Sequence, residues 1–316
     1  MIIMMKRFLM FIGGMLGVAI VVLAFLLIPA HIQVRSVTPD LPTQDDLLAL
    51  RSNQAPVNVS YVLTSSQPLR LGQISHISVL VEWANGDLFM IDTGMSEEQA
   101  SDFGSLLKKM DSSAGEVTIV GTISSLLGAK IKDVKGVGFT HLHIDHTQGL
   151  ENFCQARGPG ALVLQTPSQK TLHNFNTTEG AAIIEDSCLE GEALLSSPGG
   201  ALLVSERFPG VAAFQLGGHT PGSTLWAVAL GEKVLLFSGD ITNDKSSIEH
   251  NKAKSLIYSY LFVPENTKRT TALRKWFKEL DQSNEFSVIV SHDLNNTQTH
   301  LHKFNRNTIS SYTNPH

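Results

Sequence analysis

The sequence predicts an α/β protein with layered, mixed β-sheets, and two observations lead to this fold class. Residues 77–94 and 224–240 each contain two apolar strands joined by a short turn, the pattern of an antiparallel hairpin. Helical patterns lie between and after these hairpins, most clearly in residues 264–281. Hairpins interspersed with helices favour mixed sheets covered by helices over a simple doubly wound parallel sheet. The chain has 316 residues, of which 42% are hydrophobic, so it can form a sizeable core.

The N-terminus is expected to form a transmembrane anchor ahead of this fold. Residues 8–30 contain no charged side chain, and at about 1.5 Å per helical residue they can cross a hydrocarbon core of roughly 30 Å. Lys6 and Arg7 place residues 1–7 on the cytoplasmic side. The alternative is a cleaved signal peptide, but its apolar core usually has about 7–15 residues, and no A-x-A cleavage site is evident. We therefore expect the remaining chain outside the cytoplasm, in the periplasm if the source is a Gram-negative bacterium.

A polar segment separates this anchor from the domain. Residues 31–56 contain three prolines, so we predict a linker there, with one short helix at 45–51. Residues 57–316 are then the catalytic domain.

The first predicted elements of the domain follow from local patterns. Residues 57–63 alternate with period two, as a half-buried strand does. In the hairpin 77–94, the dipeptide Asn85–Gly86 is a strong two-residue turn signal. A helix follows, with Ser96 as its N-cap and Gln99 three residues later, which is a plausible capping box.

The later elements are short strands and one long helix. Apolar runs predict strands at 134–141 and 161–166, and a hairpin follows at 224–240. Apolar residues recur at helical spacing in 264–281, which indicates an amphipathic helix packed on the core. Residues 286–293 are the last buried strand.

Charge and cysteine content limit the function. The net charge is −5 and no basic run is visible, so we expect a small-molecule substrate and no nucleic acid partner. Cys154 and Cys188 are compatible with one disulfide in an oxidising compartment or with two buried thiols, and neither lies in a CxxC pair.

A cluster of metal-binding side chains follows the strand at 134–141. His141 and His143 are two residues apart, so they point the same way in an extended chain, and Asp145 continues that side. His146 can join them only if the chain turns, for which Gly149 is suited. Imidazole and carboxylate groups are the ligands that borderline divalent metals prefer. The sequence therefore predicts a metal site here, with enough ligands for part of two adjacent ions.

The remaining ligands are expected downstream, where polar side chains directly follow apolar runs. His219 lies in the turn GGHTPGS, Asp240 ends the run VLLFSGD, and His292 ends VIVSHD. Each residue alone is a weak signal, because strands often end in Asp or His. Together with the first cluster they predict convergence at one edge of the sheets.

This order of motifs resembles that of the metallo-β-lactamase superfamily of metallohydrolases. HxHxDH comes first, then a lone His in GHTPGS, an Asp in SGD and a final His, and the resemblance covers about residues 57–292. It implies an αββα sandwich, in which two mixed sheets pack face to face with helices outside.

The resemblance also implies a role for each residue. His141, His143 and His219 would bind one metal, Asp145, His146 and His292 would bind the second, and Asp240 would bridge them. In the motif IDTG, Asp92 would support the metal loop without binding metal, and Gly94 and Gly149 would be turn residues.

These ligands imply hydrolytic chemistry. Two ions, zinc in the first place with iron or manganese as alternatives, would ionise a shared water, because zinc lowers the pKa of water from about 15.7 to about 7. The bridged hydroxide would attack a small-molecule ester, lactone or related acyl substrate, and Asp145 is the candidate proton donor for the leaving group.

The branch of the superfamily is less defined than the chemistry. β-Lactamases of the commonest type have a Cys where this chain has Asp240, so that activity is disfavoured. The all-His/Asp set resembles the lactonase and glyoxalase II branches. Lactonases carry a Tyr three residues after the bridging Asp, and here Asn243 occupies that position. Tyr258 and Tyr260 are alternative candidates, with simple packing as the competing interpretation.

Two other functions remain open. Persulfide dioxygenases share the scaffold but bind a single iron through two His and one Asp, which would leave the other ligands unused. A non-catalytic metal-binding membrane module is the third possibility. Metal content separates the first two functions, and turnover of an ester or lactone separates the third.

Overall fold

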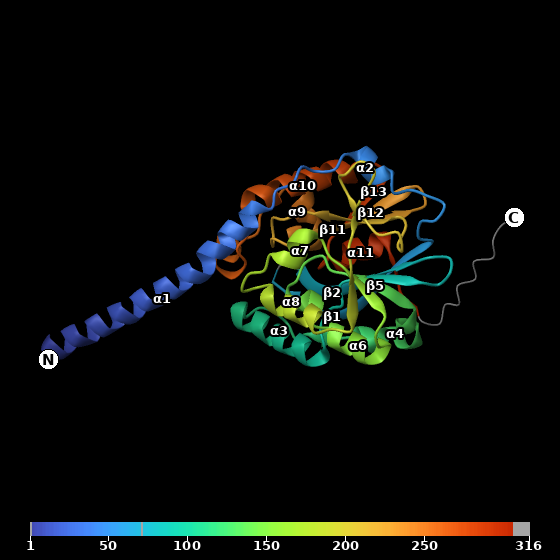
Figure 1. Ribbon diagram of the computed structural model, residues 1–316. Coiled ribbons are helices and arrows are strands. Elements are labelled where there is room, and N and C mark those ends of the chain that lie inside the picture. Colours follow the sequence, from blue (N-terminus) through green and yellow to red (C-terminus); the bar gives the residue numbers. More distant parts are fainter. Residues whose placement is uncertain (1, 71, 306–316) are drawn as a thin grey trace.

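Two β-sheets packed face to face form the centre of the protein, with helices on both outer faces (Figure 1). The computed structural model describes residues 2–70 and 72–305, except for the side chains of residues 2–10, 12, 16, 19 and 20. Both sheets contain parallel and antiparallel pairs. The predicted sandwich of two mixed sheets with outer helices is therefore confirmed.

The first sheet contains the predicted hairpin 77–94, as β2 and β3, together with strands that precede and follow it in the sequence. Its order is β14-β1-β2-β3-β5-β6-β7, and β4 pairs with the edge of β1. The pairs β1–β2 and β2–β3 are antiparallel, whereas β3, β5, β6 and β7 run parallel. The bounds are β1 Asn58–Leu69, β2 Gly72–Glu82, β3 Leu88–Ile91, β4 Thr118–Ile119, β5 Val134–Gly138, β6 Ala161–Leu164, β7 Leu189–Glu192 and β14 His302–Lys303.

The second sheet has the order β13-β12-β11-β10-β9-β8. Among the described strands of this sheet, β12 and β13 pair in parallel and the others are antiparallel, and the predicted hairpin 224–240 supplies β11 and β12. The bounds are β8 Leu195–Ser196, β9 Leu203–Val204, β10 Val211–Gln215, β11 Thr224–Leu230, β12 Lys233–Phe237 and β13 Phe286–Ile289.

Helices cover the two outer faces. The predicted helix after Ser96 is α3, and the Ser96 side chain accepts from the backbone N–H of Gln99 as an N-cap. The bounds are α1 Ile2–Ser36, α2 Gln44–Leu48, α3 Glu97–Met110, α4 Ile123–Leu127, α5 Ile144–Thr147, α6 Leu150–Arg157, α7 Pro167–Thr171, α8 Thr178–Glu185, α9 Lys245–Glu249, α10 Thr267–Asp281 and α11 Leu294–His300. Short 3-10 helices lie at η1 Gly128–Asp133 and η2 Gly239–Ile241, and a π-helix lies at η3 Tyr258–Phe262.

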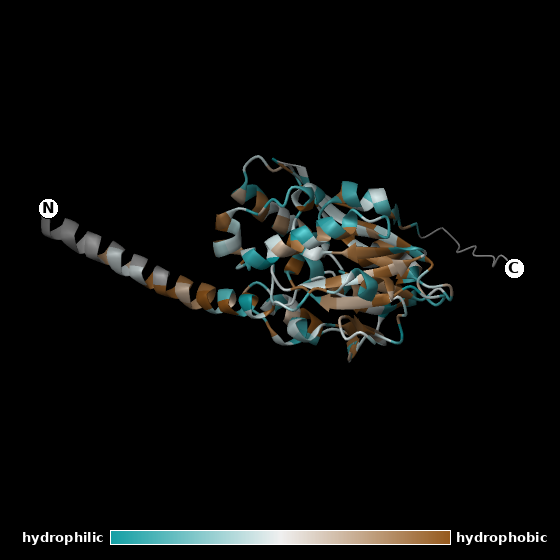
Figure 2. Cartoon of the chain, turned by 90° about the horizontal axis from the view of Figure 1, so that it is seen from above, coloured by the Kyte–Doolittle hydropathy of each residue, from teal (hydrophilic) through white to brown (hydrophobic). Residues whose placement is uncertain are grey.

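Three buried apolar clusters account for the layers. The central cluster joins both sheets, with Phe89 and Val79 from the first sheet packed with Trp226 and Val228 from the second. One outer cluster joins the second sheet to α10, as the amphipathic pattern at 264–281 predicts. The other outer cluster joins the first sheet to α4, α6 and α8. Figure 2 shows these apolar residues concentrated along the strands.

Helix α1 projects from the body of the protein (Figures 1 and 2). Among its described side chains, those of Ala30 and Val34 near its C-terminal end are buried. In the part of the chain that the structure describes, no helix is both long and apolar enough to cross a membrane. The transmembrane anchor predicted at 8–30 is therefore not supported, although the stretch is helical. The side chains of the predicted cytoplasmic residues 1–7 lie outside the described residues.

The segment predicted as a linker, 31–56, lies against the second sheet over part of its length. Leu47 on α2 is fully buried in the outer cluster, with Leu41, Leu48 and Leu50 beside it. The short predicted helix is present as α2, capped by Thr43.

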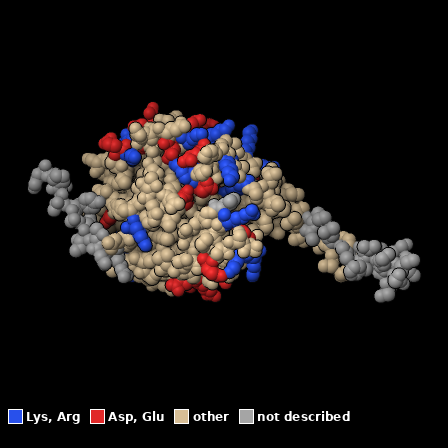
Figure 3. Space-filling model, turned by 180° about the vertical axis from the view of Figure 1, so that it is seen from behind, with Lys and Arg blue, Asp and Glu red and all other residues tan. Residues whose placement is uncertain are grey.

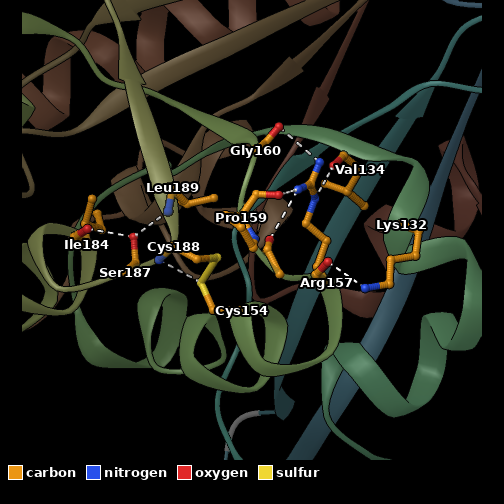
Figure 4. The surroundings of a disulfide bond; sticks show 11 residues. Lys132, Val134, Cys154, Arg157, Pro159, Gly160, Ile184, Ser187, Cys188 and Leu189 are labelled. Atoms are coloured by element: carbon orange, nitrogen blue, oxygen red, sulfur yellow. Dashed lines mark hydrogen bonds between the residues drawn. A yellow bond between two sulfur atoms is a disulfide. The ribbon is translucent and has the colours of Figure 1, made fainter.

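Cys154 and Cys188 form a disulfide and are not two buried thiols, which was the alternative left open by the sequence (Figure 4). It joins α6 to the segment between α8 and β7. Nearby, Arg157 at the end of α6 donates from Nε to the Val134 carbonyl at 2.9 Å, which ties α6 to the start of β5.

Charges of both signs share the face of the protein shown in Figure 3. Lys and Arg side chains lie next to Asp and Glu side chains on this face, and much of it carries neither.

Candidate metal centre

The loop that carries HxHxDH begins where β5 ends at Gly138. A Cβ at this glycine would lie 2.2 Å from Trp226, so glycine is needed for the indole to pack there. The indole N–H and the side-chain amide of Gln169 donate to the Phe139 carbonyl at 3.1 and 2.9 Å. These bonds fix the chain just before the first ligand.

Asp92 holds the same loop from the side of β3. Its carboxylate accepts from the backbone N–H and the hydroxyl of Thr140, both at 2.8 Å. One of its oxygens also lies 2.9 Å from His146 Nδ1. Asp92 thus orients a predicted ligand through the ring nitrogen that faces away from the centre, as second-layer carboxylates do in metal sites.

The structure brings all seven predicted ligands together. His141, His143 and His219 form one group, in which His143 Nδ1 lies 3.0 Å from His141 Nε2 and 3.3 Å from His219 Nε2. All three come from loops at strand ends, as the sequence predicted. His143 and His219 are 76 residues apart in the sequence, so the fold and not local sequence brings the group together.

The other four predicted ligands surround a neighbouring position. Asp145 Oδ2 lies 3.6 Å from His146 Nε2 and 3.5 Å from His292 Nε2. Asp240 lies between the two groups, because Oδ2 is 3.0 Å from His292 Nε2 and 3.9 Å from His219 Nε2. Asp240 is therefore in reach of ligands from both groups.

His76 joins this second position, although sequence reasoning did not identify it. It lies in the middle of β2, and its Nε2 is 3.6 Å from Asp145 Oδ2. His76, Asp145 and His292 form a compact group of potential ligands. The chain around His76 carries no motif, so nothing in the sequence distinguished it from a packing residue.

Glu265 is the second residue that the sequence did not reveal. Its Oε1 lies 2.6 Å from His219 Nδ1, and its Oε2 accepts from the Ser259 hydroxyl at 2.6 Å. Lys254 Nζ lies 3.3 Å from the same carboxylate and donates to the Asp240 carbonyl at 2.8 Å. A buried charge network therefore orients His219 and braces the loop of Asp240.

Burial lowers the pKa of the histidines in the centre, but neighbouring carboxylates raise the pKa of some of them above the usual value. Burial and the neighbouring imidazoles lower the pKa of His143 to about 3. At His146 burial also acts against the charge, but Asp145 and Asp92 outweigh it and raise the pKa of His146 to about 10. Burial would raise the pKa of Asp240, yet the histidines around it hold that pKa well below the usual value. Ionised carboxylates and neutral imidazoles bind cations, so His146 must release a proton to do so.

The donor atoms fit divalent cations. His76 Nε2, His146 Nε2 and Asp240 Oδ1 are buried and have no hydrogen-bond partner among the described residues. Ligand bonds of about 2.0–2.2 Å in a tetrahedron place neighbouring donor atoms about 3.3–3.6 Å apart. The separation of 3.5 Å between His146 Nε2 and Asp240 Oδ1 lies in this range. Unsatisfied buried polar atoms at ligand spacing are the arrangement expected of a metal centre.

A cavity of about 390 Å³ opens onto the centre. His143, Asp145, Asp240 and His292 line it together with Asn243 and Tyr258. Most of the remaining wall is apolar and includes Phe103, Leu107, Met110, Phe175 and Phe262. The cavity is of a size typical for small-molecule sites.

Tyr258, one of the two candidate tyrosines, lines this cavity, and Tyr260 does not. Burial, with Asp240, Glu265 and Asp145 nearby, raises the pKa of Tyr258 well above its usual value. Tyr260 is 40% exposed, and its backbone carbonyl lies 3.1 Å from Nε2 of His31 on α1. The phenol near the centre therefore comes from η3 and not from the position three residues after Asp240.

Comparisons with known proteins agree with this geometry. The sequence model of the metallo-beta-lactamase superfamily matches residues 72–292. No curated protein matches the sequence of the chain.

Several solved structures share the fold. An N-acyl homoserine lactone hydrolase with the product N-hexanoyl-L-homoserine at its catalytic metal centre has a TM-score of 0.55 and 16% identity, over 78% of this chain and 96% of that one. AiiA of B. thuringiensis, a variant with N-decanoyl-L-homoserine bound at the active site, has the same TM-score of 0.55 and 16% identity, over 78% and 96%. AidC, a dizinc quorum-quenching lactonase, has a TM-score of 0.51 and 14% identity, over 77% and 90%. At these identities the similarity shows a common fold.

Proposed function

The chain belongs to the metallo-beta-lactamase superfamily, and on that premise we propose that it is a hydrolase that uses two divalent cations to cleave an ester or lactone bond in a small molecule. The observation that carries this proposal is the convergence of buried donor atoms without hydrogen-bond partners among the described residues, at the spacing of metal ligands. His141, His143 and His219 would hold one cation, and Asp145, His146 and His292 the other, with Asp240 between them. Zinc suits these ligands, and iron or manganese are the alternatives.

When bound, such cations polarise the substrate oxygen and lower the pKa of water, so that the nucleophile forms at neutral pH. The protein supplies orientation and proton transfer. Asp145 is 8% exposed and lines the cavity, so its carboxylate can accept a proton from the attacking water and return it to the leaving oxygen.

Tyr258 and Lys254 complete this machinery. The Tyr258 phenol keeps its proton because its pKa is raised, so it can donate a hydrogen bond to the oxygen on which negative charge develops. Lys254 Nζ lies 5.0 Å from the centre of the Tyr258 ring and orients it from the side of Asp240. This phenol would have the role of the Tyr that lactonases carry three residues after the bridging Asp, where this chain has Asn243.

The apolar wall of the cavity favours a substrate with a hydrocarbon chain. Phe103, Leu107 and Met110 on α3 and Phe175 offer such a chain an apolar surface, while the ligands and Tyr258 line the part of the cavity where the reacting group would lie. The molecules bound in two of the similar structures are N-hexanoyl- and N-decanoyl-L-homoserine, which also combine an acyl chain with a polar head. We infer that the substrate is an acylated lactone or ester.

The alternatives fit these observations less well. A single iron bound by two His and one Asp would leave His76, His146 and His292 buried without a role. A non-catalytic module would not need a cavity that joins the centre to an apolar wall. The disulfide favours an oxidising compartment outside the cytoplasm as the place of action.

The test uses the full chain, stripped of metal and reloaded with Zn²⁺, Mn²⁺ or Fe²⁺. Turnover is measured on lactones and esters with short and long acyl chains, on thioesters, on phosphodiesters and on a β-lactam, with metal content measured in parallel. We expect two ions per chain and the highest kcat/KM on a long-chain lactone or ester. His143→Ala should lose turnover and bind less metal, and unchanged turnover in this variant would contradict the proposal.

A further inference from the structure

We propose that His76 is an eighth ligand of the centre and binds the second cation through Nε2, together with Asp145 and His292. The proposal rests on the proposed function, because it requires that cations occupy the centre. It goes beyond that function by adding a ligand that lies outside every motif of the sequence.

The position of His76 satisfies the distances of a ligand. Its Nε2 lies 3.6 Å from Asp145 Oδ2, and His292 Nε2 lies 3.5 Å from the same oxygen. Both separations fall at the spacing of about 3.3–3.6 Å that ligand bonds of about 2.0–2.2 Å produce in a tetrahedron. His76 therefore stands to Asp145 as the predicted ligands His146 and His292 do.

The hydrogen bonding of His76 leaves one ring nitrogen free for a cation. The side chain is 3% exposed, and Nε2 has no hydrogen-bond partner among the described residues. The other nitrogen, Nδ1, lies 2.9 Å from the hydroxyl oxygen of Ser65. When Nδ1–H donates to that hydroxyl, the lone pair of Nε2 faces Asp145, which is the arrangement that orients metal-bound imidazoles.

The backbone of β1 is shaped to make this contact. The register between β1 and β2 shifts between Leu63 and Ser65, so that Ser65 pairs with His76 while Leu63 pairs with Ile77. Such bulges re-aim side chains and are frequent next to active sites. Without the extra residue, the hydroxyl of Ser65 would not lie opposite the imidazole.

The surroundings do not explain His76 as a packing residue. Its ring makes edge contacts with Phe103 and with His292, each at a centroid distance of 5.3 Å. An aromatic ring without nitrogen would pack equally well between these neighbours and would not bury an unpaired polar atom, which costs free energy. The presence of a histidine at this position is therefore best explained by a ligand for its Nε2 atom.

A ligand at this position makes the two cation sites unequal. The second site then has five protein ligands, namely His76, Asp145, His146, His292 and Asp240, and the first has four. A higher coordination number suits the second site to cations that accept more than four ligands.

The test compares the full-length wild-type chain with His76→Phe, which keeps the ring volume and removes both nitrogens. Metal-free protein is titrated with Zn²⁺ against a chromophoric chelator, and the visible absorption spectrum is recorded with two equivalents of Co²⁺. We expect two ions per wild-type chain. In His76→Phe one site should keep its affinity, the other should weaken by more than the roughly 10–100-fold that loss of an orienting partner causes, and the Co²⁺ bands should change. His250→Phe, at an exposed histidine on the end of α9, is the matched control and should match wild type.

The outcomes distinguish this proposal from the proposed function. If wild type binds two ions and His76→Phe binds both with unchanged affinity and Co²⁺ spectrum, His76 is not a ligand while the hydrolase proposal stands. If wild type binds no pair of ions and hydrolyses nothing, the proposed function itself fails. If His76→Phe does not fold, Ser65→Ala decides, because it must weaken the second site about tenfold if His76 binds there. Unchanged second-site affinity in Ser65→Ala would overturn the proposal.

Discussion

Replacing Glu265 with Gln tests how far buried charge behind the ligands sets metal affinity. The carboxylate is 3% exposed, and its Oε1 lies 2.6 Å from His219 Nδ1. Gln has the same shape but no charge, so Glu265→Gln keeps the packing volume, weakens the charge-assisted bond to His219 and removes the negative charge that pairs with Lys254. The affected cation is the one held by His141, His143 and His219.

The expected magnitude follows from the contacts of Glu265. Partners that orient a metal-bound imidazole contribute about 10–100-fold to affinity, which corresponds to about 1.4–2.7 kcal/mol. A hydrogen bond to a charged group contributes about 1.5–3 kcal/mol, which agrees with that range. Lys254 adds to the effect, because its ammonium group lies 3.3 Å from Glu265 and its side chain is only 11% exposed. Without the carboxylate, this positive charge remains beside His219 and disfavours a cation.

The assay is a Zn²⁺ titration against a chromophoric chelator, with kcat/KM measured on the preferred substrate. Glu265→Gln should weaken the first site about 10–100-fold and leave the second within a factor of about two. Adding Lys254→Met should restore part of the lost Zn²⁺ affinity of the first site, since it removes the uncompensated charge, whereas kcat/KM should stay low because Lys254 also orients Tyr258. Glu279→Gln, on the exposed face of α10, is the control. Wild-type affinity of both sites in Glu265→Gln would refute the reasoning that this carboxylate tunes His219.

Three further predictions concern catalysis, stability and pH. Tyr258→Phe should lower kcat about 10²–10³-fold without changing metal content, and kcat should show no loss from phenol ionisation up to pH 9, because the pKa of Tyr258 is raised. Cys154→Ser/Cys188→Ser should lower the free energy of unfolding by up to about 4 kcal/mol, since the disulfide closes a loop of 34 residues; urea denaturation measures it, and an unchanged midpoint would contradict it. Metal-free protein should lose stability as the pH falls from 6.5 towards 3, by about 1.4 kcal/mol per pH unit for each imidazole that folding keeps neutral, such as His143 with its pKa lowered to about 3. The reason is that the unfolded chain takes up a proton at such an imidazole and the folded chain does not. His146 behaves in the opposite way: because its pKa is raised to about 10, its contribution to stability is complete below pH 6.5 and is lost only as the pH rises above that value. Equal stability of the metal-free protein at pH 7.5 and pH 5.0 would contradict the prediction.

The parts of the fold that could be predicted from sequence are those with local causes. The hairpin signal of Asn85–Gly86 and the cap at Ser96 depend on neighbouring residues alone, and both elements formed where expected, although the hairpin loop spans residues 84–86 and not the two residues of the predicted turn. The predicted ligands were visible because each follows an apolar run, and ends of strands meet at one edge of a sandwich. Their convergence therefore followed from topology.

His76 and Glu265 could not be found in this way, because their roles depend on contacts that the sequence does not encode locally. His76 lies inside a strand, and its orientation depends on a bulge in β1 that has no turn residue to indicate it in the sequence. Glu265 precedes α10 and reaches a histidine 46 residues earlier in the chain. In the apolar stretch 8–30 the composition predicted a helix correctly, but the prediction that this helix spans a membrane is not supported.

Close backbone packing explains why the ligand loop can be ordered by the protein itself. We expected Gly149 to serve a turn, but its φ is −70°, which any residue adopts. It is required for space, because a Cβ there would lie 2.1 Å from the Thr93 carbonyl oxygen. The N–H of Gly149 donates to the Gly94 carbonyl at 2.8 Å, and Gly94 has a φ of +65°.

This contact brings the IDTG turn against the metal loop and sets Asp92 beside His146. The ligands are then oriented from three directions without a cation, by Asp92 at His146, by the Ser75 carbonyl 2.9 Å from His292 Nδ1 and by Glu265 at His219. A pre-ordered centre loses little conformational freedom when cations bind, so more of the ligand bond energy appears as affinity. Substitutions in the glycine turn should therefore weaken metal binding through geometry, even though no glycine side chain touches a ligand.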